Sequence, residues 1–146
     1  MCRKKTRIIK KYISFLILFF VLVYINQFRV VIVSGVSMEP TLKNRSIHLI
    51  KRESSYKRDD IIVFKKGNET IIKRIVAINN DKVGLREGKI LINSVEQKYY
   101  IYDGKNIEYD IEPNQVFVLG DNTYNSVDSR NYGPIDIELI VGKIVV

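Results

Sequence analysis

Residues 60–77 read DIIVFKKGNETIIKRIVA, two apolar runs joined by the short polar turn Lys66-Gly67-Asn68. The runs, 61–65 and 70–78, are rich in β-branched residues, and Gly-Asn is typical of a tight turn between strands. Two strands joined by a turn are therefore expected here, as part of an antiparallel β domain.

Within these two strands, Lys73 is the residue that does not fit a simple core pattern. Because side chains on a strand alternate, Lys73 should share a face with Ile71, Ile75 and Ala77, while Arg74 projects to the other side. Folding ordinarily avoids a charged residue on an apolar face, unless the lysine extends along the surface to reach solvent. Lys73 is thus either a snorkelling strand lysine or a functional group.

The pattern of short Val-, Ile-, Tyr- and Phe-rich runs continues along the chain after position 30. Further strands are expected over 30–33, 47–51, 82–85, 89–92, 98–102, 115–119 and 141–146, with turns between them at Gly, Asn, Asp and Pro. Only 135–140 has a short helix-like pattern. The fold class is therefore mainly β, with one antiparallel, barrel-like sheet domain over 30–146.

The N-terminus has a different composition. Residues 12–28 are 17 consecutive uncharged, mostly apolar residues, near the short end of what spans a bilayer. A cleaved signal peptide has a similar basic start and apolar middle, but no small-x-small cleavage pattern follows here. We expect a retained transmembrane helix over 12–28, with a cytoplasmic basic tail over 1–11 and residues 30–146 outside the cytoplasm.

Charge and composition exclude several classes of protein. The net charge is +8, but six basic residues and no acidic one lie in the first eleven positions, so the rest carries only +2. This distribution argues against a nucleic-acid-binding face. With Cys2 as the only cysteine and His48 as the only histidine, an intrachain disulfide and a multi-histidine zinc site are excluded. His48 alternates with Ile47 and Leu49, which favours a structural or surface role.

A serine directly after the apolar segment suggests the partner for Lys73. Residues 33–42 read VSGVSMEPTL, with Ser37 at their centre. A serine hydroxyl becomes a nucleophile only with a base that can accept its proton near neutral pH. Lysine, with an ordinary pKa of about 10.4, can do this only when burial lowers that pKa. An apolar strand face would supply such burial for Lys73.

A third block, residues 120–135, reads GDNTYNSVDSRNYGPI. Together with the serine block, the lysine block from Lys73 to Ala77 and the preceding strand from Asp60, it resembles type I signal peptidases, in that family's order and behind an anchor. These are membrane-anchored Ser-Lys proteases that cut signal peptides from exported proteins. The resemblance extends over essentially the whole chain.

The resemblance implies a role for each matching residue. Ser37 would be the acylating nucleophile and Lys73 the general base. The supporting residues would be Ser126, which orients the lysine amine, and the charged pair Asp128 and Arg130, for which a surface ion pair is the alternative. Met38 would line the pocket beside the scissile bond, or else only pack in the core. At Gly35 some relatives have a serine that donates to the oxyanion, so backbone N–H groups, including that of Ser37, are expected to serve here.

The resemblance further implies a signal peptidase I of minimal, Gram-positive-like form in the bacterial cell membrane. It would act as a monomer without cofactor or metal, with signal peptides of exported pre-proteins and the lipid bilayer as partners. Its substrates would bind as an extended strand, with alanine-like residues at the first and third positions before the cut. A peptidase dedicated to one secreted or pilus substrate, and a non-catalytic assembly relative, remain alternatives. Self-cleaving repressors use a similar dyad, but they are cytosolic and carry a DNA-binding domain.

Two departures from the family pattern affect loops near the site. Residues 77–81 read AINND where relatives commonly have Gly-Leu-Pro-Gly-Asp, so only Asp81 matches. Thr123 stands where an arginine is usual, which leaves the surrounding ion pairs open. Neither change removes a group that would move a proton.

Overall fold

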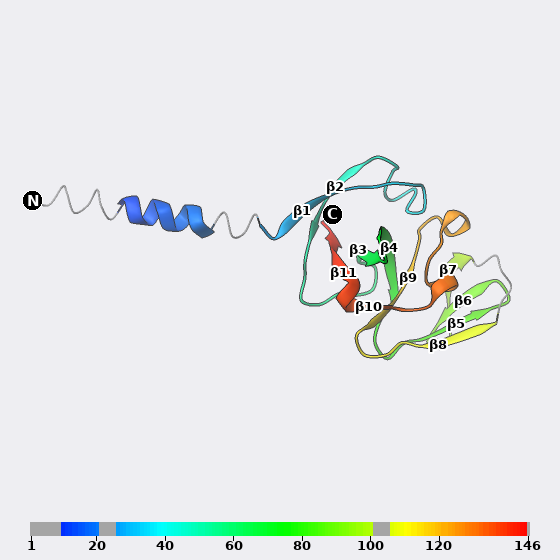
Figure 1. Cartoon of the computed structure of the whole chain (residues 1–146). Helices are drawn as coiled ribbons and strands as arrows, with labels where there is room; N and C mark the ends of the chain where they lie inside the picture. The colour runs from blue at the N-terminus through cyan, green and yellow to red at the C-terminus, as the bar shows by residue number, and fades with distance from the viewer. Residues whose placement is uncertain (1–9, 21–25, 101–105, 146) are drawn as a thin grey trace, which may run out of the picture.

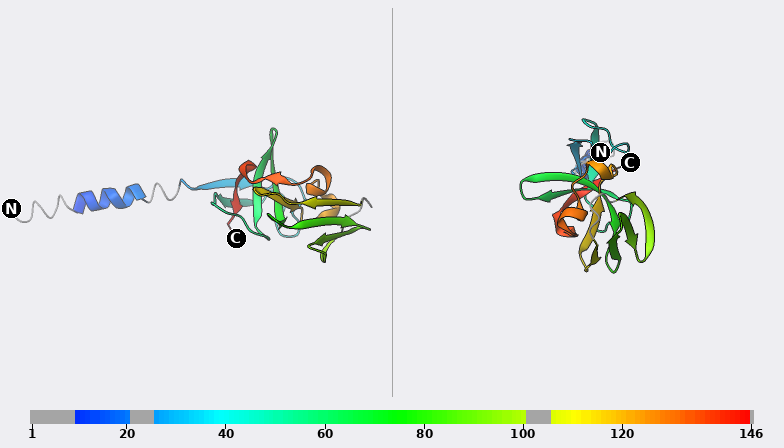
Figure 2. Two further views of the ribbon diagram at one scale, coloured as in Figure 1. Left: turned by 90° about the horizontal axis from the view of Figure 1, so that it is seen from below. Right: turned by 90° about the vertical axis from the view of Figure 1, so that its right-hand side faces the viewer.

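The computed structural model describes residues 10–20, 26–100 and 106–145. Residues 10–20 form a helix with exposed side chains, and from Phe28 onward the regular structure is mainly β-strand (Figure 1). In both views of Figure 2 the β-strands gather into one body. The expectation of a mainly β fold is confirmed.

The predicted span 12–28 is only partly described, because residues 21–25 lie outside the described residues. No helix in the described ranges is both long and apolar enough to cross a membrane. The last residue of the predicted span, Phe28, is the first residue of β1 (Phe28–Ile32) and pairs with Lys51. Lys10 and Lys11, assigned to the tail, belong to the helix.

The larger sheet has seven antiparallel strands in the order β1-β2-β11-β3-β4-β9-β10. Besides β1, its members are β2 (Ile47–Lys51), β11 (Ile140–Ile144), β3 (Ile61–Lys66), β4 (Glu69–Ala77), β9 (Gln115–Leu119) and β10 (Ile135–Asp136). The two strands expected around Gly67 form the β3–β4 hairpin, in register from Ile61 opposite Arg74 to Lys66 opposite Glu69. Among the described strands β1 and β10 end the order, so the expected barrel-like closure is not observed.

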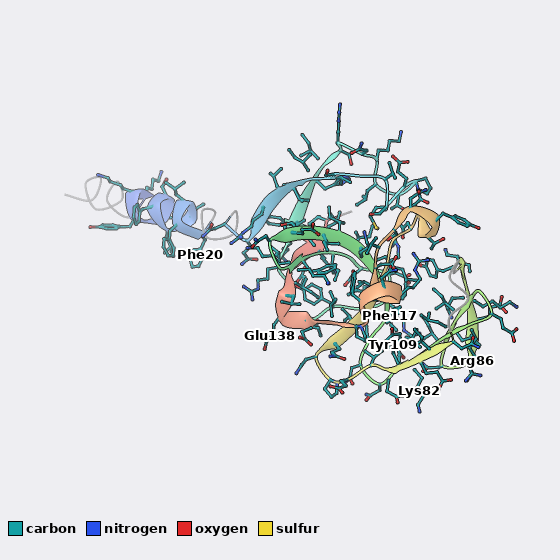
Figure 3. The ribbon with its side chains drawn as sticks, turned by 45° about the vertical axis from the view of Figure 1, so that its right-hand side comes forward. Phe20, Lys82, Arg86, Tyr109, Phe117 and Glu138 are labelled. Atoms are coloured by element: carbon teal, nitrogen blue, oxygen red, sulfur yellow. The ribbon has the colours of Figure 1, made fainter. Side chains whose placement is uncertain are left out.

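A second sheet of four strands, in the order β7-β6-β5-β8, packs beside the first. Its members are β7 (Val95–Tyr100), β6 (Lys89–Ile92), β5 (Lys82–Arg86) and β8 (Ile107–Asp110). Figure 3 shows Lys82 and Arg86 on the outer surface of this sheet, and Tyr109 beside Phe117 on its inner side. The two rings lie 5.3 Å apart between centroids and join β8 to β9.

The core consists of three apolar clusters. The first joins the two sheets through Ala77, Leu85, Phe117 and Leu119. The second lies under the serine segment, and the third lies between the β3–β4 hairpin and β9. Thus each segment with a candidate site residue is attached to buried apolar side chains.

Three short helical turns were only partly expected. They are η1 (Thr123–Asn125), α2 (Ser129–Tyr132) and η2 (Ile137–Leu139). The helix-like pattern at 135–140 is in fact β10, η2 and the start of β11, because the segment pairs with Val116 and then with Phe64. The predicted strand at 98–102 corresponds to β7, and residues 101–102 lie outside the described residues.

Candidate active site

Ser37 lies in a turn after β1 that is held at both ends. The Val33 N–H donates to the Ser46 carbonyl at 2.9 Å, and the Arg45 N–H donates to the Val33 carbonyl at 2.8 Å. Met38 is buried in the second apolar cluster. This anchoring fixes the turn while leaving Ser37 itself half-buried.

Gly35 contributes backbone conformation to this turn. Its φ of +96° lies in the region that side chains disfavour. Its N–H donates to Asn44 Oδ1 at 3.1 Å, so that amide already has a partner. None of the hydrogen bonds between described residues engages the N–H of Ser37.

Lys73 lies on β4 opposite Ile62 and is only 4% exposed. Ile71 and Ile75 flank it in the third cluster, as alternation predicts. Ala77 belongs to the first cluster instead, because the register with β9 shifts between Ile75 and Ala77. The lysine is therefore embedded in the sheet and is not a snorkelling surface residue.

The two candidate catalytic groups are in direct contact. Lys73 Nζ donates to Ser37 Oγ at 2.7 Å, although the residues are 36 positions apart in the sequence. Burial lowers the pKa of the Lys73 amine, the Asp128 charge partly opposes this effect, and the Arg130 charge adds to it. The amine is thus disposed to be neutral at a lower pH than an ordinary lysine, as a general base requires.

The loop after β9 packs against the serine turn. A Cβ on Gly120 would lie 2.2 Å from Ser126 Oγ and 2.6 Å from the Ser37 carbonyl oxygen, so only glycine fits there. The Gly120 N–H donates to Asp128 Oδ2 at 3.0 Å. The end of β9 therefore contacts the serine turn with its backbone.

Asp128 and Arg130 form a buried ion pair, with 2.7 Å between Asp128 Oδ1 and Arg130 Nε. Asp128 is 0% exposed and Arg130 is 7% exposed, so the alternative of a surface pair is wrong. Asp128 also caps α2, and Arg130 donates to the carbonyls of Thr123 and Ser126 at 2.8 and 3.2 Å. The pair holds both ends of the loop, and Thr123 takes part through its backbone.

Ser126 lies beside this loop, but it makes no hydrogen bond with Lys73. Its Oγ is buried and has no hydrogen-bond partner among the described residues. The predicted hydrogen bond by which Ser126 would orient the Lys73 amine is therefore not observed. The hydroxyl lies next to Gly120, where it can still donate or accept a hydrogen bond.

Several residues near the site were not predicted as functional. Arg74 and Asp121 form a two-bond ion pair, with 2.7 Å from Arg74 Nε to Asp121 Oδ1, on the face of β4 away from Lys73. Asn122 binds the serine turn, as described below. The only sequence signal for these residues was their position: Arg74 follows Lys73, and Asp121 and Asn122 follow Gly120.

The departure at 77–81 does not loosen the turn after β4. Asp81 is buried and accepts from Arg58, from the Ile78 N–H at 2.8 Å and from Asn93 Nδ2 at 2.9 Å. Burial opposes ionisation of Asp81, but these hydrogen bonds outweigh it and lower its pKa. Asn80 adopts a φ of +68°, which supplies the turn that glycine provides elsewhere.

A groove of about 690 Å³ runs over the dyad. One wall is the segment from Val30 to Met38, and the other is β4 from Glu69 to Lys73 with Asn125, Val127 and Tyr132. Along residues 69–73, β4 pairs with β3 on one side, whereas β9 pairs only from Arg74 onward. The other edge of β4 is thus left to the groove.

The chain was compared with known proteins. The family model described as signal peptidase, peptidase S26, matches residues 5–146. A crystal structure of a signal peptidase I from Enterococcus faecalis is similar in fold, with a TM-score of 0.52 at 21% identity, covering 63% of this chain and 98% of that one.

Curated relatives come from organelles and bacteria. Thylakoidal processing peptidase 1 of Arabidopsis thaliana is 35% identical over 136 residues, covering 77% of this chain, which spans only 39% of that protein. Mitochondrial inner membrane protease subunit 1 of Xenopus tropicalis is 37% identical, with 83% of this chain and 68% of the relative covered. Signal peptidase I of Bacillus amyloliquefaciens is 35% identical, covering 68% of this chain and 64% of the relative. The chain therefore belongs to the signal peptidase family, peptidase S26, as the three sequence blocks predicted.

Proposed function

We propose that this chain is a membrane-bound serine endopeptidase, a signal peptidase I, that removes N-terminal signal peptides from exported pre-proteins. The single observation that carries the proposal is the 2.7 Å hydrogen bond between the buried amine of Lys73 and Ser37 Oγ. A buried lysine with a lowered pKa and a serine as its partner are the two groups that acyl transfer requires.

The reaction proceeds in two halves. Neutral Lys73 takes the proton of Ser37 as Oγ attacks the scissile carbonyl, and the resulting ammonium gives that proton to the leaving amine. This produces an ester on Ser37 and releases the mature protein. Lys73 then takes a proton from water, which attacks the ester, and returns that proton to Ser37 Oγ as the signal peptide leaves. The N–H of Ser37 donates to the oxyanion in both halves.

Ser126, Asp128 and Arg130 support this chemistry. The Asp128–Arg130 pair fixes the loop after β9, which contacts the serine turn. The buried hydroxyl of Ser126, which has no other partner among the described residues, is available to orient the lysine amine when substrate excludes water. Met38 supports the floor of the groove from the core below Ser37.

The substrate is an extended peptide that adds to the free edge of β4. Main-chain hydrogen bonds to residues 69–73 would hold it with the scissile bond at Ser37. The Val36 and Val127 side chains on the groove favour small apolar residues before the cut. Alanine-like residues at the first and third positions would fit beside these two valines.

The bilayer is the second partner. The helix over 10–20 exposes apolar side chains such as Phe15 and Phe20, and β1 exposes Val30 and Ile32. The basic residues up to Lys11 favour a cytoplasmic N-terminus, with the catalytic domain outside the bacterial cell membrane. One copy of the chain supplies both Ser37 and Lys73, which is consistent with a monomer.

The test is cleavage of a labelled pre-protein by the purified full chain in detergent, with the new N-terminus identified. Ser37→Ala is expected to lose at least a thousandfold in kcat/KM, because the hydroxyl forms the acyl-enzyme. Ser54→Ala, at an exposed serine outside the groove, is the matched control. A Ser37→Ala variant within tenfold of the parent would contradict the assignment. Cleavage of only one pre-protein in a panel would favour a dedicated peptidase, and no cleavage at all a non-catalytic relative.

A further inference from the structure

Asn122 makes two hydrogen bonds to consecutive residues of the serine turn. Its backbone N–H donates to the Ser37 carbonyl at 3.0 Å, and its Nδ2 donates to the Val36 carbonyl at 3.2 Å across 86 positions of sequence. The loop after β9 is thereby joined to the nucleophile by one residue.

The side-chain bond acts on the peptide unit that matters for an oxyanion. The Val36 carbonyl and the Ser37 N–H belong to the same planar unit, which is trans, so the two groups point in opposite directions. Fixing the carbonyl towards Asn122 therefore turns the Ser37 N–H away from it. That N–H takes part in no hydrogen bond between described residues.

A second donor assists but cannot fix the plane alone. The Glu39 N–H also donates to the Val36 carbonyl, at 3.1 Å, within the same turn. It comes from the segment that carries Ser37 and would move with it, whereas Asn122 is attached to β9 through Gly120 and Asp121. Asn122 thus holds the Val36–Ser37 peptide plane in a fixed orientation relative to the sheet that carries Lys73, because β9 pairs with β4.

We propose that Asn122 is a positioning residue that aims the Ser37 N–H at the developing oxyanion, by holding the Val36 carbonyl through its side-chain amide. The inference rests on the proposed peptidase function and concerns the same site. Preorganised donors lower the barrier because they need no reorientation as charge develops. Asn122 touches neither Lys73 nor Ser37 Oγ by hydrogen bond, so proton transfer should not depend on it.

The test compares Asn122→Ala and the near-isosteric Asn122→Leu with Gln97→Ala as a matched control. Gln97 donates from its side-chain amide to the Val95 carbonyl at 2.9 Å, outside the groove. Both Asn122 variants keep the backbone bond to Ser37. We expect kcat to fall about tenfold to a hundredfold with KM and the acidic limb of the pH profile unchanged, and the control to stay within about twofold.

Two ligands distinguish a change in the orientation of the Ser37 N–H from a general change in the conformation of the loop. A peptide aldehyde ending in alanine forms a hemiacetal on Ser37 with its oxygen in the oxyanion position, whereas the matching peptide alcohol does not. Asn122 variants should bind the aldehyde about tenfold or more weakly and the alcohol as the parent does. If the parent is active but the Asn122 variants lose affinity equally for both ligands, the positioning role is wrong. It is also wrong if the variants keep the kcat of the parent. A parent that neither cleaves a pre-protein nor binds the aldehyde would refute the proposed function, and this inference with it.

Discussion

At the scale of the residue, Lys73 combines burial with charge, and this has a consequence for stability. Its pKa is lowered chiefly by burial, so at neutral pH the unfolded chain binds a proton more readily than the folded one. Burial of the charged Lys73 amine therefore destabilises the folded state. This loss of stability is complete below the folded-state pKa and disappears as the pH rises towards the ordinary value of about 10.4. Replacing the lysine should therefore stabilise the protein.

We expect Lys73→Met to be inactive and to have a Tm a few degrees above that of the parent at neutral pH, because methionine fills similar space without a charge. The gain should shrink steadily as the pH is raised towards about 10, which thermal unfolding across a pH series would measure. Lys73→Arg, which stays protonated, should be inactive without this gain. A gain that grew with pH would contradict the stated direction of the pKa shift.

Sequence reasoning went far at this scale for Ser37 and Lys73. Alternation on β4 placed the lysine among isoleucines, and the block pattern paired it with the serine. Asn122 was not predicted from the sequence, because its proposed role depends on a hydrogen bond to a backbone carbonyl 86 positions away. Ser126 was identified from its place in the third block, although its hydroxyl makes no hydrogen bond to any described residue.

At the scale of the element, the segment from β9 through α2 depends on one buried carboxylate. Asp128 accepts from Arg130, from the Gly120 N–H and from the first turn of α2. Removing it would leave the Arg130 charge buried without its carboxylate partner, which costs far more than losing an exposed pair.

Asp128→Ala should therefore lower the free energy of unfolding by about 3–5 kcal/mol, measured as a shift of the urea midpoint. Asp110→Ala is the matched control, because Asp110 pairs with Lys82 on the surface, where its side chain is 80% exposed. The control should change stability by about 0.5 kcal/mol or less. Similar losses in the two variants would show that burial of the Asp128 pair has no special weight.

Elements with weak local signals were the ones missed. In β8, Glu108 and Asp110 alternate with Ile107 and Tyr109, and the acids are matched by basic residues on β5 rather than by an apolar core. The four-residue α2 is shorter than any helical period can reveal and relies on the Asp128 cap. Both are specified by partners from other segments, whereas the β3–β4 hairpin is specified by its own sequence.

At the scale of the whole molecule, orientation in the membrane is the property that sequence predicts and the described residues do not test. The basic cluster before position 12 favours a cytoplasmic N-terminus. A reporter active only in the cytoplasm should be silent when fused after Val146 and active when fused before Met1. Activity in the C-terminal fusion would contradict the proposed topology.

Ser37 and Lys73 come from separate parts of the chain, and Gly120, from a third part, packs against the Ser37 carbonyl and Ser126. On the proposed topology, Ser37 emerges from the membrane first and the Gly120 loop among the last segments. A partly translocated chain then has Ser37 outside the membrane before Lys73, or both residues outside before the loop that carries Gly120. On this topology the protein would acquire the capacity to cleave only after nearly all of the catalytic domain has crossed the membrane and folded.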